Sequence, residues 1–157
     1  MIPPLTNYQL EDILKHDPIL NFCGVFPYDK IPWRVQQYPC GFIVNTDKSH
    51  KPGEHWISLY FDRQRNCQYF CPLGTQPFGL LFDFAERNSN TTYYNQTTLQ
   101  HPMDSLCGYY CVYHLLHAAR GSTLYDIVNR FSTSMLKKND QVIFDFVHSW
   151  VEELVDL

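Results

Sequence analysis

The sequence has no hydrophobic run long enough to cross a membrane and no surplus of positive charge. No window approaches the roughly 18 uninterrupted apolar residues of a spanning helix, and the first residues lack the basic and apolar segments of an export signal. Twelve Lys and Arg stand against 16 Asp and Glu, a formal net charge of −4. We therefore expect a protein that is neither secreted nor bound to a membrane, and nucleic-acid binding is disfavoured as its main activity.

The sequence has no Cys-x-x-Cys pair of the kind that forms a zinc knuckle, although the chain has 6 cysteines. Without an export signal, these cysteines are expected to be thiols in a reducing compartment. Cys107, Cys111, His114 and His117 share one face of a predicted helix, a spacing that superficially suggests zinc. One helix seldom supplies the three or four ligands of a structural zinc site, so we expect no metal and no cofactor.

Apolar and aromatic residues are abundant, at 45% and 16% of the 157 residues. This content excludes intrinsic disorder, and the length suits a single domain over residues 1–157. Strands and capped helices occur without a regular βαβ alternation. The sequence therefore predicts an α+β fold in which a mainly antiparallel sheet packs against helices.

Local patterns predict where the first helix and the strands lie. Thr6 and Gln9 form a capping box for a short helix that ends before Pro18. Strands are expected at 41–45, at 55–61 and 67–71 as an antiparallel hairpin, and from residue 91. The remainder of 21–52 is rich in Pro and Gly and is expected to be loop, and the stretch after Pro72 is too weakly patterned for a prediction.

Three helices are predicted in the last third of the chain. The central one runs from Cys107 to Arg120, is capped by Ser105 and ends at Gly121, and its apolar residues lie nearly all around it, as in a buried helix. Ser122 and Asp140 are expected to cap two amphipathic helices that follow.

Cys107 and His55 are the first candidates for chemistry. Cys107 stands near the start of the central helix, where free N–H groups and the macrodipole favour thiolate over thiol. Most unpaired cysteines only pack the core, so a partner base has to decide its role. His55 lies at the mouth of the hairpin, at a strand end from which side chains reach clefts. The adjacent Trp56 could shield the imidazole or point to the opposite face of the strand.

Two further positions could complete a site. With the hairpin turn centred near residue 63, Cys71 lies directly across from His55, where a group that orients the imidazole is expected. A carboxylate or amide would fix the tautomer, whereas a neutral thiol is a weak acceptor. Gln100 could donate to a developing oxyanion together with the Cys107 backbone N–H. Other groups that could orient the imidazole are Asp62, Asp83 and Glu86.

Three ordered motifs carry a family resemblance: Gly53-Glu-His-Trp56, Tyr69-Phe-Cys-Pro-Leu-Gly74 and Gln100-His-Pro-Met-Asp-Ser-Leu-Cys-Gly-Tyr-Tyr-Cys111. Together they resemble the adenovirus maturation protease, adenain, over about residues 8–120. The resemblance implies that Cys107 is the nucleophile, His55 the general base and later acid, and Gln100 the oxyanion-hole side chain. The family has Glu or Asp where this chain has Cys71, so we expect a dyad of Cys107 and His55.

The resemblance also implies a function. It points to a cysteine endopeptidase that cuts viral structural precursors near small residues or glycine, during particle maturation in the host nucleus or the virion. One alternative is an isopeptidase for ubiquitin-like modifiers, and another is a structural or adaptor descendant with weakened catalysis. Protein or peptide substrates are the expected partners. Any activating peptide should bind without a disulfide, because residues 88–99 lack cysteine, and DNA stimulation is not expected of an acidic chain.

Overall fold

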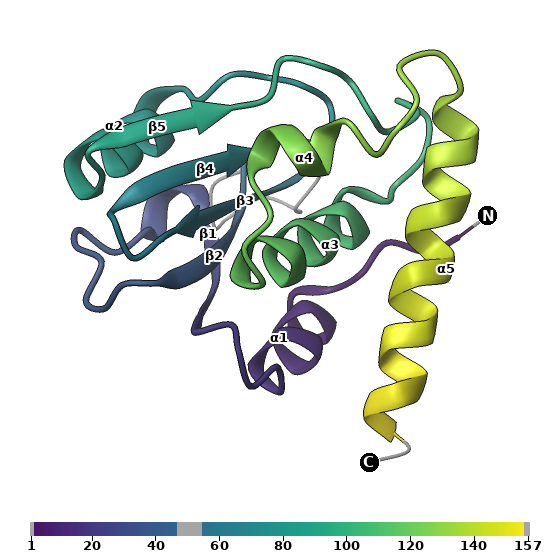
Figure 1. The fold of residues 1–157 in the computed structure, drawn as a ribbon, viewed down its shortest axis with the longest axis horizontal. Coiled ribbons are helices and arrows are strands. Elements are labelled where there is room, and N and C mark those ends of the chain that lie inside the picture. The colour runs from purple at the N-terminus through teal and green to yellow at the C-terminus, as the bar shows by residue number, and fades with distance from the viewer. Residues whose placement is uncertain (1, 47–54, 156–157) are drawn as a thin grey trace.

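The computed structural model describes residues 2–46 and 55–155, which form a five-stranded sheet with helices on both faces (Figure 1). The elements are α1 (Asn7–Lys15), β1 (Phe22–Pro27), the 3-10 turn η1 (Tyr28–Lys30), β2 (Cys40–Asn45), β3 (Trp56–Phe61), β4 (Asn66–Phe70), α2 (Gly79–Asn88), β5 (Thr91–Tyr94), α3 (Cys107–Ala119), α4 (Leu124–Val128) and α5 (Leu136–Val155). The strands lie in sequence order across the sheet, from β1 to β5. Gly53 and Glu54, which begin the first motif, lie outside the described residues.

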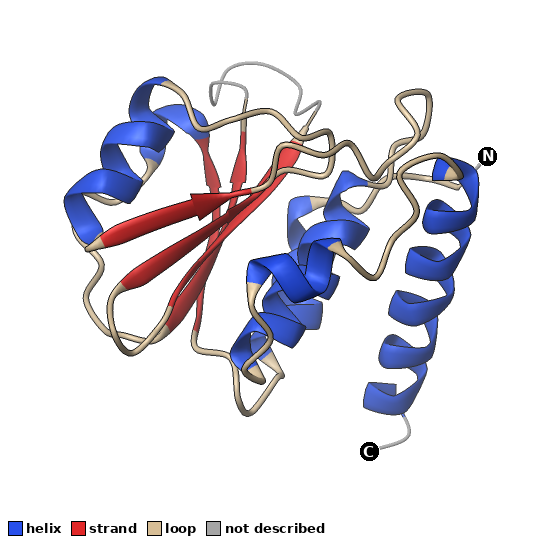
Figure 2. Cartoon of the chain, turned by 45° about the horizontal axis from the view of Figure 1, so that its top comes forward, coloured by secondary structure: helices blue, strands red, loops and turns tan. Residues whose placement is uncertain are grey.

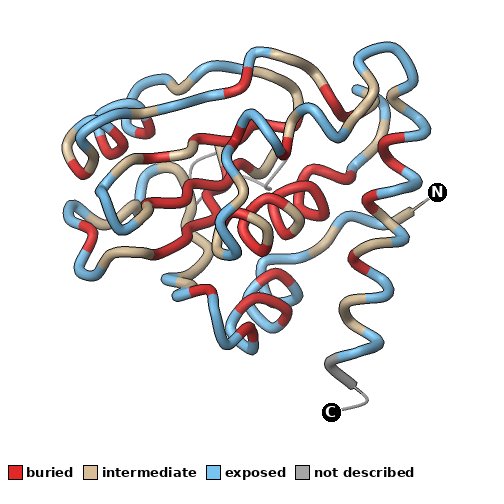
Figure 3. The backbone as a smooth tube through the Cα atoms, in the orientation of Figure 1, coloured by how far each residue is buried: buried red, intermediate tan, exposed pale blue. Residues whose placement is uncertain are grey.

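Each face of the sheet has its own apolar core, because neighbouring residues of a strand point to opposite faces. Phe42 and Val44 of β2 pack with Phe84 of α2 on one face. Ile43 of the same strand joins Leu115 of α3 on the other face, where α1 and α5 also pack. The helix α3 lies between the sheet and α5 and is buried almost all round (Figures 2 and 3). Among the described residues, no helix has the length and apolar character of a membrane span.

The sheet is mixed, which corrects the prediction of a mainly antiparallel one. The central pairs β2–β3 and β3–β4 are antiparallel. The outer pairs β1–β2 and β4–β5 are parallel. Parallel neighbours need a crossover connection, and α2 provides it between β4 and β5. The sequence-based account misses this helix and therefore the direction of β5.

Two elements were not predicted, and each has a physical reason. The helix α2 carries apolar residues on both sides, with Leu81 buried and Phe82 exposed, which hides its helical period. The strand β1 lies at the sheet edge and contains a bulge between Phe22 and Gly24, and the φ of 138° at Gly24 favours glycine. Edge strands tolerate the bulges and prolines that made this segment look like loop.

The capping box of Thr6 and Gln9 is confirmed, and so is the hairpin. Other predicted caps are wrong. Leu106 occupies the N-cap of α3 instead of Ser105, and Thr123 caps α4 instead of Ser122. The helix α5 begins at Leu136, so Asp140 lies a turn inside it. The hydroxyl of Ser132 accepts from the Met135 N–H at 2.9 Å and so takes the capping role near that helix start.

Candidate active site

Cys107 is the first residue of α3 and lies in the interior, with its residue only 5% exposed. The backbone N–H of Trp56, at the start of β3, donates to the Cys107 Sγ at 3.3 Å. Burial raises the pKa of the Cys107 thiol, while the N–H groups of Trp56, Gly108 and Cys107 itself act to lower it. The N–H groups at the helix N-terminus therefore lower the pKa of Cys107, as predicted, but the effect of burial is larger. A thiolate at Cys107 consequently needs a base to accept the thiol proton.

His55 directly precedes β3, as expected of a side chain at a strand end. Its carbonyl accepts from the Thr46 N–H at 2.9 Å, which fixes the backbone at this edge. The ring Nε2 lies 3.2 Å from the Cys71 Sγ. Two consecutive residues, His55 and Trp56, thus contact Cys71 and Cys107 respectively. The start of β3 therefore lies against both Cys71 and Cys107.

The predicted contact between His55 and Cys71 is confirmed, but the hairpin register from which it was predicted is wrong. The hairpin pairs Ser58 with Phe70, so it is centred on residue 64 rather than 63 and Cys71 is not directly across from His55. The side chains meet by reaching along the strands. The alternative orienting groups lie elsewhere: Asp62 binds the backbone N–H of Gln64 and Asn66 in the hairpin turn, and Asp83 and Glu86 are on the exposed side of α2.

Asn95 holds Cys71 in place, and the sequence analysis missed it. Its Oδ1 accepts from the Cys71 N–H at 2.9 Å and its Nδ2 donates to the Cys71 carbonyl at 2.6 Å. The side chain is buried and lies just past the end of β5. An Asn after a strand is common in turns, so nothing in the sequence distinguishes this one.

Gln100 is buried next to the same segment. Its backbone N–H donates to the Pro72 carbonyl at 3.2 Å, which ties it to the residue after Cys71. Its Nε2 donates to the Asp104 carbonyl at 2.5 Å. That nitrogen has a second hydrogen, which an oxyanion could accept. The Oε1 atom is buried and has no hydrogen-bond partner among the described residues.

The histidines of the zinc-like pattern are bound to protein groups. His114 Nδ1 lies 2.7 Å from the Ser58 Oγ and its Nε2 lies 3.0 Å from the Gln68 Oε1. Burial lowers the pKa of His114 to about 3, so the ring is neutral. His117 Nδ1 lies 2.8 Å from the Tyr113 carbonyl. Within residues 2–46 and 55–155, no group of three His, Cys, Asp or Glu is spaced to hold a metal ion.

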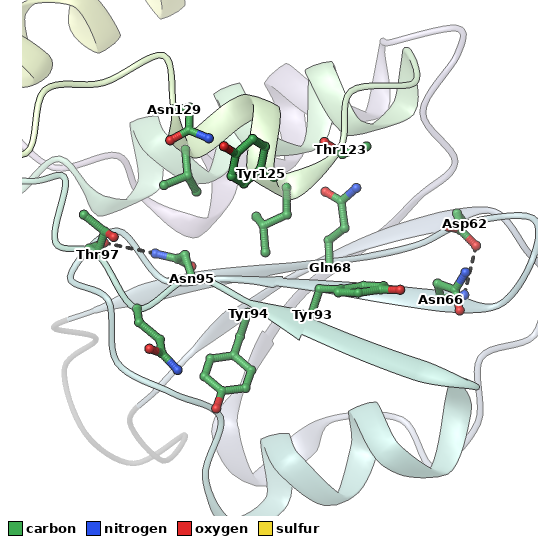
Figure 4. A pocket seen from close by; sticks show the side chains of 13 residues that line it. Asp62, Asn66, Gln68, Tyr93, Tyr94, Asn95, Thr97, Thr123, Tyr125 and Asn129 are labelled. Carbon is green, nitrogen blue, oxygen red and sulfur yellow. Dashed lines mark hydrogen bonds between the residues drawn. The ribbon is translucent and has the colours of Figure 1, made fainter.

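A cleft of about 600 Å³ lies between α4 and the strands β4 and β5, and its lining includes none of the predicted catalytic residues (Figure 4). Tyr93 and Tyr125 stand on its two sides, and Asn95 both lines the cleft and binds Cys71.

The indole of Trp56 packs near Gly108 at the start of α3, where a Cβ on that glycine would lie 3.5 Å from the Trp56 Cδ1. Trp56 therefore covers the first turn of α3.

Comparisons of the sequence with known proteins give partial matches. No profile of a known protein family matches the chain. A cysteine protease of African swine fever virus is 36% identical over 55 residues, which is 31% of this chain and 20% of the relative. A SUMO-1 cysteine protease of another isolate of this virus is 33% identical over 60 residues, 34% of this chain and 22% of the relative. The chain thus matches about a fifth of the length of these relatives.

Comparisons of the structure extend over more of the chain. A crystal structure of the African swine fever virus protease matches with a TM-score of 0.65 at 18% identity, covering 87% of this chain and 66% of that one. The central domain of an uncharacterized Legionella pneumophila protein matches with a TM-score of 0.58 at 14% identity, covering 99% of this chain and 100% of the domain. The chain is therefore a low-identity homologue of viral cysteine proteases over part of its length, with the α+β fold of the African swine fever virus enzyme.

Proposed function

We propose that this protein is a cysteine endopeptidase in which Cys107 attacks a peptide carbonyl and His55 moves the proton. The observation that carries the proposal is the junction at the start of β3, where the Trp56 N–H binds the Cys107 Sγ and the adjacent His55 ring contacts Cys71. Because His55 adjoins Trp56, whose N–H binds the Cys107 Sγ, we assign the proton exchange with Cys107 to the His55 ring. The homology to cysteine proteases supports the same reaction class.

The reaction would proceed through an acyl-enzyme. His55 takes the thiol proton as the Cys107 sulfur bonds to the substrate carbonyl carbon, and the carbonyl oxygen becomes an oxyanion. The Gln100 Nε2 and the Cys107 backbone N–H would stabilise that charge. The protonated His55 then gives its proton to the leaving amine, and the C–N bond breaks. Water attacks the thioester, with His55 as its base, and restores the thiol.

The substrates that we propose are viral structural precursors, cut near small residues or glycine in the host nucleus or the virion, by the resemblance to adenain. We expect a single catalytic domain over residues 1–157. An activating peptide would bind without a disulfide, since residues 88–99 carry no cysteine, and DNA would have little effect on an acidic protein.

An isopeptidase for a ubiquitin-like modifier is the second candidate. One relative is described as a SUMO-1 cysteine protease, which favours this reading. Both activities would use the same nucleophile and base, because an isopeptide and a peptide present the same carbonyl. The two activities differ in the surface that recognises the substrate. Assays of cleavage with purified modifier conjugates and with linear precursor proteins therefore distinguish the isopeptidase from the endopeptidase. A protein inert to both would be the adaptor descendant.

Selective labelling of Cys107 tests the proposed function. A vinyl sulfone carrying a Gly-Gly peptide should alkylate Cys107 at neutral pH, and a Gly-Gly reporter should be cleaved. The experiment is best done with Cys23→Ser protein, because Cys23 is exposed and a hydrogen bond with Cys40 lowers its pKa. Adding His55→Ala should slow labelling at least tenfold, since the buried thiol then lacks its base. Mass mapping that finds the label elsewhere would contradict the assignment.

Cys71→Asp should retain or raise turnover. A carboxylate at this position would lie beside the His55 Nε2 and stabilise the imidazolium, as the acid of a triad does. The gain is limited, because Cys71 is 1% exposed and a buried carboxylate is costly unless it is paired. Steady-state kinetics on the Gly-Gly reporter measure the effect, with Cys67→Asp as a buried control away from His55. A large loss of kcat would show that the Cys71 thiol has a role of its own.

A further inference from the structure

The loop that joins Gln100 to Cys107 is held from outside the sheet by α5. Lys137 Nζ lies 2.8 Å from the Asp104 Oδ1, and Asn139 Nδ2 donates to the Leu99 carbonyl at 2.9 Å. The backbone N–H of His101 points at both carboxylate oxygens of Asp140, at 3.4 Å. One side of α5 therefore contacts both ends of the segment 99–104, and α5 runs past the start of α3 (Figure 1).

Asp140 is the centre of these contacts. It is only 3% exposed, and it receives the Tyr110 hydroxyl at 2.6 Å. The same hydroxyl lies 3.2 Å from the Leu99 carbonyl. Because a hydroxyl has one hydrogen, it can donate fully to only one of these two acceptors at a time. Asp140 therefore joins Tyr110 of α3 to the backbone of the loop at His101.

We propose that Asp140 and Lys137 of α5 clamp the loop after Gln100 and so position Gln100 for the oxyanion, which makes Asp140 a positioning residue for the reaction proposed above. The link to Gln100 is direct, because its Nε2 is bound to the Asp104 carbonyl. The loop from residue 101 to 106 has exposed residues and little regular structure of its own. Without the clamp, the Gln100 amide would lose the support that orients it relative to the start of α3.

The clamp should be sensitive to pH. Burial and the nearby Asp104 carboxylate raise the pKa of Asp140 to about 7, while Asp140 and Lys137 lower that of Asp104. Above that pH the buried Asp140 is charged and is repelled by the Asp104 carboxylate, which weakens the clamp. The other titratable groups that face the pair are His101 from the loop, Tyr110 from α3 and Lys137 from α5. Asparagine at 140 keeps an acceptor for the Tyr110 hydroxyl and the His101 N–H but does not titrate.

The test compares Asp140→Asn, Asp140→Ala and the wild type between pH 6 and 9, with kcat and KM measured on the Gly-Gly reporter. Asp145→Asn is the matched control, since Asp145 is exposed on the same helix. Asp140→Ala should lower kcat about tenfold and leave KM within about twofold, because a misplaced catalytic group mainly slows the chemical step. Asp140→Asn should match the wild type at pH 6 and exceed it at pH 8.5, where the wild-type clamp has opened.

Amide hydrogen exchange of residues 99–106 separates this inference from the proposed function. Exchange should be faster in Asp140→Ala than in Asp145→Asn. In the wild type, exchange between pH 6 and 8.5 should increase by more than the intrinsic pH dependence of amide exchange. If the wild type is active and all three variants have its kcat and pH profile, the proposed clamp is wrong. A wild type without turnover would overturn the proposed function, and unchanged exchange in Asp140→Ala would then overturn the clamp as well.

Discussion

Cys107→Ala is expected to abolish turnover, lowering kcat/KM roughly 10⁴-fold or more, because no other group can form the acyl-enzyme at this position. The fold should survive, since Cys107 is a small side chain and the loss of a sulfur from a buried position costs about 1 kcal/mol. Progress curves on the Gly-Gly reporter measure the loss. Unchanged circular dichroism and a thermal midpoint within a few degrees would show that the variant is folded.

The matched control is Cys111→Ala, one turn further along α3. Cys111 is fully buried, and burial raises the pKa of its thiol well above the usual value, so it is unsuited to be a nucleophile. Its replacement should keep turnover within about tenfold at a similar cost in stability. If Cys107→Ala retained turnover, the nucleophile would have to be sought at Cys71, the other sulfur that His55 is placed to reach.

The parts of the fold that the sequence predicts are those with strong local signals. The capping box at Thr6, the alternation of the hairpin and the apolar helix after Cys107 each depend on neighbours within a few residues, and each is present. Local signals also place His55 at a strand end and Cys107 at a helix start, which is where the structure has them. The contact with Cys71 could be predicted from the hairpin alone, even though the predicted pairing is two residues out of register.

The parts that the sequence does not predict depend on distant neighbours. The strand β1 is stabilised by pairing with β2, and α2 by the core around Phe84, so neither needs a strong pattern of its own. The same holds in the site. Burial, which no sequence spacing reveals, reverses the expected direction of the Cys107 pKa. The role of Asn95 is not predictable from local sequence either, because its side chain binds the backbone of Cys71, 24 residues away.

His114→Gln should make the protein less sensitive to acid. His114 is fully buried between Ser58 and Gln68, and its ring stacks on Phe70 at 4.9 Å. Burial lowers its pKa from 6.5 to about 3 in the folded state. Between these values the unfolded chain binds a proton that the folded protein does not. Stability is therefore lost as the pH falls from about 6.5 towards 3, by about 3 kcal/mol between pH 7 and pH 4.

Urea unfolding at pH 4, 5, 6 and 7 isolates this contribution. Glutamine keeps an amide near Ser58 and Gln68 but does not titrate, so the variant should be less stable at pH 7 and lack the acid loss due to this residue. The raised pKa of Asp140 gives an opposite slope, since its proton stabilises the folded state below about pH 7, and this slope is the same in both proteins and cancels in the difference. His148→Gln, on the exposed surface of α5, is the control. Parallel stability curves for the wild type and His114→Gln would mean that His114 binds a proton as readily in the folded protein as in the unfolded chain. Its Nδ1 would then donate to the Ser58 Oγ while its Nε2 donates to the Gln68 Oε1.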